Sequence, residues 1–265
     1  DTDRRSLETT GQPMIENIQI TTADRVTTLT IARPEKRNAI TQAMYGAMAD
    51  ALEHYATSDD SRAFVITGAD EYFTSGNDIR DFSMGDQGDA TPPVLRFLTA
   101  ISHCPKPVIA AVNGPAIGVG VTMLLHCDLV MAAAGATFST PFVQLGLVPE
   151  AGSSMLLPAA VGMAVANEML LAGRVLDATE AVNFGLASRV FSSADLLGKV
   201  HATAINVAAS APNSMKETKG LIRHGRDQML EQMQKESVLF AAQLKSTEFA
   251  EVVQAKMLKR MPVFD

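Results

Sequence analysis

The sequence predicts an α/β fold of repeated strand, loop and helix units, followed by a helical C-terminal region. Short apolar runs alternate with glycine-rich turns and helical patterns at intervals of roughly forty to fifty residues. Beyond about Pro158 the pattern becomes helical. No linker rich in proline, glycine and serine divides the 265 residues, which favours one large domain with a smaller appendage over two equal domains.

The chain begins with a predicted hairpin and helix. Residues 15–31 contain two β-rich runs around Ala23-Asp24-Arg25, a pattern typical of two strands joined by a tight turn. Thr41 is expected to cap a helix that continues to about Tyr55, because its side chain can accept a hydrogen bond from an amide of the first turn. The apolar residues of this helix recur at helical spacing and are Met44, Met48, Leu52 and Tyr55.

Three short apolar runs then predict buried strands, at residues 63–67, 107–112 and 129–133. Between the second and third lie a glycine-rich turn at 114–120 and a helical pattern at 121–127. Further helices are predicted at residues 164–172, 178–185 and 211–226, and a long, methionine-rich amphipathic pattern runs from 228 to 259. We therefore expect a loose leader over 1–13, a core over 14–200 and a helical region over 201–265.

Composition excludes several classes of protein. The net charge of −7 argues against a nucleic-acid binder, which would carry a basic face. No run of about eighteen apolar residues predicts a membrane span. The two cysteines, Cys104 and Cys127, form no spaced framework, and the chain shows no signal, transit or peroxisomal motif, so we expect a cytoplasmic protein. The scattered histidines have no partners at metal-ligand spacing, so no metal site is expected.

Three segments are unusual for a simple core. In residues 73–82 a glycine stands between a strand-like run and a helical pattern, and in residues 113–120 three glycines precede an apolar helix. Both arrangements can point backbone amides at a ligand, and two such amides can hold one oxyanion. In residues 141–152 the lone carboxylate of Glu150 lies in an apolar run, where a raised pKa is expected. Alternatively, Glu150 only interacts with the positive end of the following helix.

Taken in this order, the segments resemble the crotonase (enoyl-CoA hydratase/isomerase) superfamily from about Ile15 to Phe264. The segment RPEKRNAI (33–40) is similar to the first coenzyme A-binding loop of that family, and KPVIAAVNGPAIGVG (106–120) to its second oxyanion loop. The resemblance implies a crotonase-like spiral of β-β-α turns with an acyl-CoA site in residues 14–200. It also implies that residues 201–265 form a helical oligomerisation region, in a homotrimer or a dimer of trimers.

The resemblance assigns catalytic roles to Asn77, Val119 and Glu150. Asn77 follows the loop glycine and Val119 stands between two glycines, so their amides would form the oxyanion hole. The two glutamates of the hydratases are absent: their positions hold Thr122 and Phe142, which disfavours addition of water. Glu150 resembles the catalytic glutamate of the Δ3,Δ2-enoyl-CoA isomerases. One base is enough to move a double bond by proton transfer, and no cofactor is needed beyond the coenzyme A of the substrate.

The resemblance also places the acyl-CoA thioester. The basic residues Arg33, Lys36 and Arg37 are candidates for its phosphates, although a solvated loop is the alternative for each. Asp78 is equally expected to cap the helix that Ile79 opens. Lys259 and Arg260 are further candidates for a phosphate contact, in their own or a neighbouring subunit. The remaining candidate binding residues are Ala39, Ser75, Gly76, Ile79, Arg80, Gly118 and Phe142.

Two other functions stay open at this point. One is another crotonase reaction, either hydration of an unusual enoyl thioester or hydrolysis of a thioester, and both would require water. The other is a catalytically silent acyl-CoA-binding subunit, in which Glu150 is only structural. The sequence predicts no acyl chain length, because the pocket lining is expected from segments such as 82–97.

Overall fold

The computed structural model describes residues 17–84 and 92–264, so the expected leader over 1–13 lies outside the described residues. A six-stranded sheet in the order β1-β2-β3-β4-β6-β9 forms its centre. Strand β1 pairs antiparallel with β2, and the other neighbours are parallel. The strands are β1 (Ile18–Ala23), β2 (Val26–Ile31), β3 (Ala63–Gly68), β4 (Val108–Val112), β6 (Leu129–Ala133) and β9 (Arg189–Phe191).

The first two strands form the predicted hairpin. Asp24 and Arg25 between them have φ angles of 52° and 59°. Two successive left-handed residues are the mark of the two-residue turn whose twist matches that of the flanking strands. The expectation from the sequence is therefore confirmed, although neither turn residue is glycine.

A second sheet of three short strands explains the repeated units. It contains β5 (Ala116–Ile117), β7 (Thr137–Ser139) and β8 (Leu176–Asp177) in that order. Strand β4 leads into β5, and β6 leads into β7, so each of these turns gives one strand to the large sheet and one to the small sheet. Strands β4 and β6 pair in parallel in the large sheet, and β5 and β7 pair in parallel in the small sheet, whereas β8 runs antiparallel to β7. The predicted spiral of β-β-α turns is confirmed.

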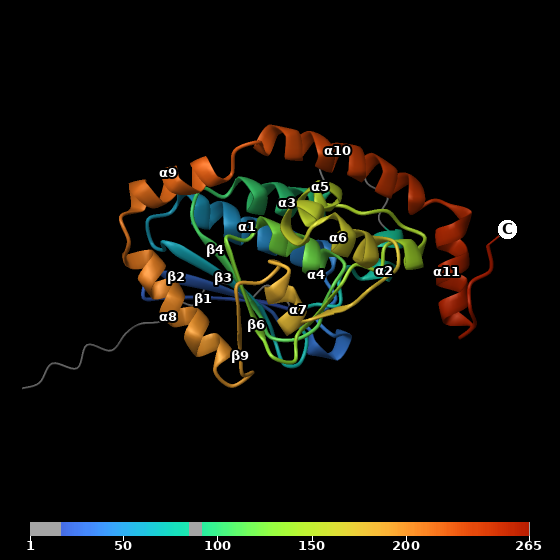
Figure 1. The fold of residues 1–265 in the computed structure, drawn as a ribbon, viewed down its shortest axis with the longest axis horizontal. Helices are drawn as coiled ribbons and strands as arrows, with labels where there is room; N and C mark the ends of the chain where they lie inside the picture. The colour runs from blue at the N-terminus through green and yellow to red at the C-terminus, as the bar shows by residue number, and fades with distance from the viewer. Residues whose placement is uncertain (1–16, 85–91, 265) are drawn as a thin grey trace, which may run out of the picture.

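Helices cover both faces of the large sheet. Helix α1 (Gln42–Thr57) begins at Thr41 as predicted, and Thr41 accepts a hydrogen bond of 3.3 Å from the Met44 amide. It packs on α3 (Pro93–His103) over one face, whereas α8 (Leu196–Ala209) lies on the other face (Figure 1). The sequence did not single out α3 or α8, and α8 continues across residue 200.

The remaining helices are short and connect the turns. The predicted helix at 121–127 is a turn of α-helix followed by a 3-10 segment, and the pattern at 164–172 is α6. The short helices that connect the turns are η1 (Pro34–Lys36), α2 (Ile79–Met84), α4 (Val119–Thr122), η2 (Met123–His126), η3 (Val143–Leu145), α5 (Ser153–Val161), α6 (Met163–Leu170) and α7 (Ala178–Asn183).

The C-terminal pattern is divided differently from the prediction. Helix α9 (Pro212–Ile222) is followed by α10 (Arg226–Gln243) and α11 (Thr247–Met257). The continuous amphipathic pattern over 228–259 is divided between two helices, because Ser246 caps a new helix by accepting a hydrogen bond of 3.1 Å from the Phe249 amide. In Figure 1, α10 runs across α5 and α11 turns away at the end of the chain. No helix in the described part of the chain is long and apolar enough to cross a membrane.

A buried ion pair fastens α9 to the core. Lys219 is 6% exposed, and its Nζ lies 2.6 Å from Asp128 Oδ2 and 2.7 Å from the Lys106 carbonyl oxygen. Asp128 Oδ1 also accepts a hydrogen bond of 3.1 Å from Arg223. Lysine can be buried here because Asp128 matches its charge and two of its three N–H groups have acceptors.

Lys219→Met is expected to lower the free energy of unfolding by about 2 kcal/mol, because it leaves the Lys106 carbonyl unpaired and removes a charged hydrogen bond from Asp128. Chemical denaturation measures this change. Lys216→Met on the exposed face of the same helix is the control, expected to change stability by less than about 0.5 kcal/mol. Equal effects of the two substitutions would contradict the structural role of Lys219.

Candidate active site

Two loops meet beside the edge where the parallel strands end. The Thr74 amide donates to the Pro115 carbonyl at 3.2 Å, and the Ile117 amide donates to the Thr74 carbonyl at 3.0 Å. The loop after β3 also bonds to the segment before α1, because the Ile40 amide donates to the Gly76 carbonyl at 2.9 Å. Segments far apart in the sequence are therefore joined through backbone hydrogen bonds at the predicted site.

The first predicted amide, that of Asn77, is left free by this pairing. The neighbouring Asp78 amide donates to the Ile40 carbonyl at 2.9 Å, while the Asn77 amide makes no hydrogen bond with any described residue. Gly76 has a φ of 91°, and a Cβ atom added to it would lie 2.8 Å from the Ile117 carbonyl oxygen. Only glycine fits this close approach of the two loops.

The second predicted amide, that of Val119, lies at the start of α4. Gly118 before it has φ 58° and ψ −118°, a conformation that side chains disfavour. The amides of Val121 and Thr122 both donate to the Gly118 carbonyl, whereas the Val119 amide has no partner in the described part of the chain. First-turn amides are unpaired within a helix and lie at its positive end. The two loops thus offer two free amides for an oxyanion.

Glu150 lies in a sharp turn before α5. Glu150 is only 7% exposed, and its Oε1 accepts a hydrogen bond of 2.5 Å from Thr122 Oγ1. Burial raises the pKa of Glu150 from 4.5 to about 7; the Thr122 hydrogen bond opposes this rise and the negative charge of Glu236 adds to it. A carboxyl group with such a pKa can both take and return a proton near neutral pH.

Thr122 and Tyr45 link Glu150 to the two loops that carry the free amides. Thr122 follows Val119 by three residues, so the two lie on the same side of α4 about one turn apart. Tyr45 donates a hydrogen bond of 2.5 Å to Asn77 Oδ1. The pKa of this buried tyrosine is raised, first by burial and then by the negative charge of Glu150. Glu150 therefore lies near Tyr45 and Thr122, each of which adjoins one of the loops with a free amide.

Another glutamate occupies the capping position that the alternative interpretation gave to Glu150. The carboxylate that accepts amide hydrogen bonds at the start of α5 is Glu236 of α10, not Glu150. Buried His126 holds the same turn, since its Nε2 lies 2.8 Å from the Ala151 carbonyl and must donate to it. Burial lowers the pKa of His126 to about 4, so its ring is neutral.

Arg33 and Asp78 are paired with each other. Arg33 NH1 lies 2.7 Å from Asp78 Oδ2 and 3.1 Å from the Ala39 carbonyl, and Asp78 Oδ1 accepts from the Arg80 amide at 3.1 Å. Burial raises the pKa of Asp78, but these hydrogen bonds outweigh it and hold the pKa below its ordinary value. Asp78 thus caps the start of α2 and bonds Arg33, which leaves the two other predicted cations facing solvent.

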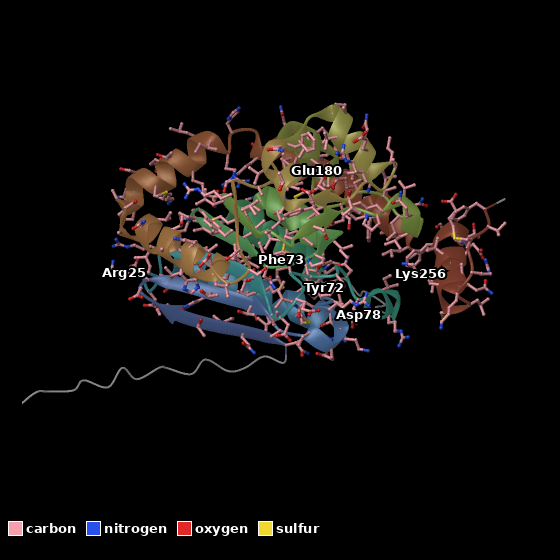
Figure 2. All side chains as sticks on the ribbon, turned by 60° about the horizontal axis from the view of Figure 1, so that its bottom comes forward. Arg25, Tyr72, Phe73, Asp78, Glu180 and Lys256 are labelled. Atoms are coloured by element: carbon pink, nitrogen blue, oxygen red, sulfur yellow. The ribbon has the colours of Figure 1, made fainter. Side chains whose placement is uncertain are left out.

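Those cations are Lys36 and Arg37, both exposed. The Arg37 guanidinium lies 5.6 Å from the centre of the Tyr72 ring, and Ser75 Oγ donates to the Lys36 carbonyl at 3.4 Å. Figure 2 labels Tyr72, Phe73 and Asp78, which lie close together in the segment that follows β3. An exposed pair of cations at the mouth of two ligand-facing loops can bind phosphate groups.

Buried Asn38 was missed in the sequence. Its Nδ2 donates to the carbonyls of Ala69 and Tyr72 at 2.8 and 2.7 Å, and its Oδ1 accepts from the Arg33 amide at 2.9 Å. It has a φ of 57°, a conformation that asparagine tolerates better than most residues. Its position next to a basic cluster made it look like part of a solvated loop, although it ties two loops together.

The family model described as enoyl-CoA hydratase/isomerase matches residues 21–265. The chain belongs to the enoyl-CoA hydratase/isomerase family. The predicted membership of the crotonase superfamily, with its isomerase-like members, is therefore confirmed.

Curated and solved relatives agree with this family. The chain is 40% identical over 227 residues to enoyl-CoA delta isomerase 2 of Rattus norvegicus, covering 83% of this chain and 58% of that protein. It is 38% identical to the peroxisomal enoyl-CoA delta isomerase 3 of Mus musculus, covering 81% and 69%. The crystal structure of an enoyl-CoA hydratase/isomerase from Pseudoalteromonas atlantica T6c matches with a TM-score of 0.92 and 49% identity, over 94% and 100% of the chains. The chain thus spans under two thirds of the rat relative.

The other residues expected from the family resemblance are placed as follows. Phe142 is 5% exposed and packs in the main hydrophobic cluster, while Ile79 is half-buried and Arg80 exposed. Arg260 is held by Glu251 at 2.5 Å, and neighbouring Lys259 is exposed. The segment 82–97, expected to line an acyl pocket, lies partly outside the described residues. Within the described ranges, no three His, Cys, Asp or Glu side chains gather as metal ligands.

Proposed function

We propose that the chain is an enoyl-CoA isomerase that converts a 3-enoyl-CoA into the conjugated 2-enoyl-CoA. The ionised Glu150 removes a proton from C2, the electrons move toward the thioester oxygen, and the amides of Asn77 and Val119 stabilise the resulting enolate. Glu150 then returns the proton to C4, so that the double bond moves to C2–C3. The proton leaves and re-enters through one carboxyl group, and no cofactor beyond the coenzyme A thioester takes part.

The observation that carries this proposal is the buried carboxyl group of Glu150, whose pKa burial raises to about 7. A base with this pKa is substantially ionised at neutral pH, and its conjugate acid is strong enough to return the proton. The two free amides supply the electrostatic stabilisation that an enolate needs, and they require no reorganisation during the reaction. The isomerase names of the similar rat and mouse proteins support the same reaction.

The hydratase alternative receives less support. The two positions expected to hold hydratase glutamates contain Thr122, which donates its hydroxyl hydrogen bond to Glu150, and Phe142, which is buried among apolar side chains. Neither can activate a water molecule as a carboxylate would. A second acid or base for water addition is therefore lacking at both positions.

We further propose that Lys36 and Arg37 bind phosphate groups of coenzyme A, since they are the exposed cations of the loop. For assembly, we propose the homotrimer or dimer of trimers that the family resemblance implies. Helices α10 and α11 and the residues after them carry exposed apolar side chains suited to subunit contacts. These are Val238, Leu239, Met257, Leu258, Met261, Val263 and Phe264.

The test is an activity screen with 2-enoyl and 3-enoyl thioesters of several chain lengths. We expect 3-enoyl-CoA to give the ultraviolet absorbance of the conjugated thioester, with deuterium exchange at C2 in heavy water. Incorporation of oxygen from oxygen-18 water would instead indicate hydration or hydrolysis. Thioester binding without C2 exchange would indicate a silent acyl-CoA-binding subunit.

Thr122→Val is expected to raise the pKa of Glu150, because the Thr122 hydrogen bond favours the ionised carboxylate. The acid limb of the kcat/KM profile should then move to higher pH, and kcat/KM near pH 7 should fall about tenfold. Thr140→Val is a matched control, since buried Thr140 Oγ1 has no hydrogen-bond partner among the described residues. An unmoved acid limb in Thr122→Val would contradict the role of Thr122.

A further inference from the structure

A glutamate on α10 reaches the active-site turn from outside the spiral. Glu236 is 4% exposed, and its Oε2 accepts a hydrogen bond of 2.5 Å from the Gly152 amide. Its Oε1 accepts from the Ser154 amide at 3.0 Å and from Ser154 Oγ at 2.5 Å. Gln232, one turn earlier on α10, donates to the same Ser154 hydroxyl at 2.8 Å. A residue 84 positions away thus supplies the cap that α5 lacks locally.

The packing around this contact is tight. A Cβ atom added to Gly152 would lie 3.2 Å from Met233 Cγ and 3.3 Å from Met229 Cγ, so α10 lies directly on the turn. Figure 1 shows α10 crossing above α5. A buried carboxylate would be costly without partners, but here amides at the positive end of a helix satisfy it. Glu236 therefore stays in place as a fixed part of the turn.

The turn also carries Glu150, two residues before Gly152. Ala151 between them has a φ of 60°, which is unfavourable for alanine and must be held by its surroundings. His126 bonds the Ala151 carbonyl on one side, and Glu236 bonds the Gly152 amide on the other. Loss of either contact would allow this strained turn to relax, and the carboxyl group of Glu150 would move with it.

We propose that Glu236 is a positioning residue, which fixes the direction of the Glu150 carboxyl group and keeps that group basic. This inference rests on the proposed role of Glu150 as the proton-transferring base. Glu236 itself has no direct contact with the substrate in this proposed role. It acts through the turn and through its charge, and it makes helix α10 a part of the active site.

The charge effect has a definite sign. The groups facing Glu150 are Thr122 on α4, Tyr45 on α1 and Glu236 on α10, while neutral His126 on η2 bonds the adjoining turn. The negative charge of Glu236 disfavours ionisation of Glu150 and so raises its pKa. Removal of that charge should lower the pKa of Glu150, in the direction opposite to Thr122→Val.

Two substitutions separate geometry from charge. Glu236→Gln removes the charge and places an amide donor near the Gly152 and Ser154 amides; we expect kcat to fall about tenfold to a hundredfold, with KM within about twofold of wild type. The acid limb of kcat/KM should move to lower pH. Glu236→Asp keeps the charge at a shorter reach, so kcat should fall while the acid limb stays in place. Glu231→Gln, exposed on the same helix, is the control and should match wild type.

A second measurement does not depend on turnover. Titration of carbon-13-labelled glutamate carboxyl groups by NMR, with the Glu150 signal assigned by its loss in Glu150→Gln, gives the pKa of Glu150 in each protein. We expect a lower value in Glu236→Gln and an unchanged one in Glu231→Gln. An unchanged pKa, or a loss of kcat that only follows the fraction of folded protein, would overturn the inference. If wild type isomerises no thioester, the proposed function fails, but the titration still decides whether Glu236 sets the basicity of Glu150.

Discussion

Glu150→Gln is expected to lower the rate of double-bond isomerisation about a thousandfold, because glutamine cannot take the C2 proton. The substitution changes little in the shape of the site. The glutamine side chain has the same shape, and its carbonyl oxygen can still accept the hydrogen bond from Thr122 Oγ1. The rate of formation of the conjugated thioester at about pH 8, where wild-type Glu150 is ionised, measures the effect. Full activity in the variant would exclude Glu150 as the base.

The same substitution should increase stability above neutral pH. The pKa of Glu150 is raised on folding from 4.5 to about 7. Between these values the folded chain binds more protons than the unfolded chain, so the free energy of unfolding falls as pH rises. The ionised carboxyl group then costs on the order of 3 kcal/mol above pH 7. Thermal unfolding should therefore show Glu150→Gln as the more stable protein at about pH 8, with the difference lost below about pH 4.

This combination distinguishes a catalytic from a structural glutamate. A structural glutamate stabilises the fold, so its replacement would lower the melting temperature and reduce activity together. A buried catalytic base has a pKa near 7 because its ionised form is destabilised, and this lowers the stability of the fold. Such a loss of stability is common at active sites. Lower stability of Glu150→Gln at every pH would show that the carboxyl group is needed for folding.

Sequence reasoning succeeded where the determinants are local. Thr41 caps α1 through the amide three residues ahead, and the glycines at 76 and 118 each take positive φ beside an amide without a partner among the described residues. Such features depend on a few consecutive residues, so a short stretch of sequence is enough to predict them. These turns indicated loops with ligand-facing amides, and the resemblance to the family then assigned those amides to Asn77 and Val119.

Sequence reasoning failed where pairs far apart in the chain decide the structure. Arg33 was a candidate phosphate ligand, and the sequence did not indicate that it bonds Asp78, 45 residues away. Tyr45 is one position beside the apolar stripe of α1, and nothing in its neighbours shows that it bonds Asn77. Glu236 lies in a polar, amphipathic pattern that favours an exposed side chain, yet it is buried against α5. Hydrogen-bond partners of this kind are set by the three-dimensional fold, so periodicity does not predict them.

Gly76→Ala is expected to lower kcat about a hundredfold without changing any side chain that could transfer a proton. Alanine is strained at a φ of 91°, and its Cβ would lie 2.8 Å from the Ile117 carbonyl oxygen. The loop must shift to relieve this contact, and the adjacent Asn77 amide shifts with it. Loss of one oxyanion donor typically costs about a hundredfold to a thousandfold. The effect should appear in kcat more than in KM, because the donor acts mainly on the enolate.

Gly198→Ala is the matched control for this prediction. Gly198 lies in α8, and a Cβ atom added there meets nothing within 4 Å. Alanine in a helix should stabilise the chain by up to about 1 kcal/mol and leave kcat unchanged. If Gly76→Ala keeps the wild-type kcat while folding normally, the Asn77 amide does not stabilise the transition state. A large loss confined to Gly76→Ala would instead make the backbone of this loop a catalytic element, with Glu150 acting on a thioester whose oxygen that loop has fixed.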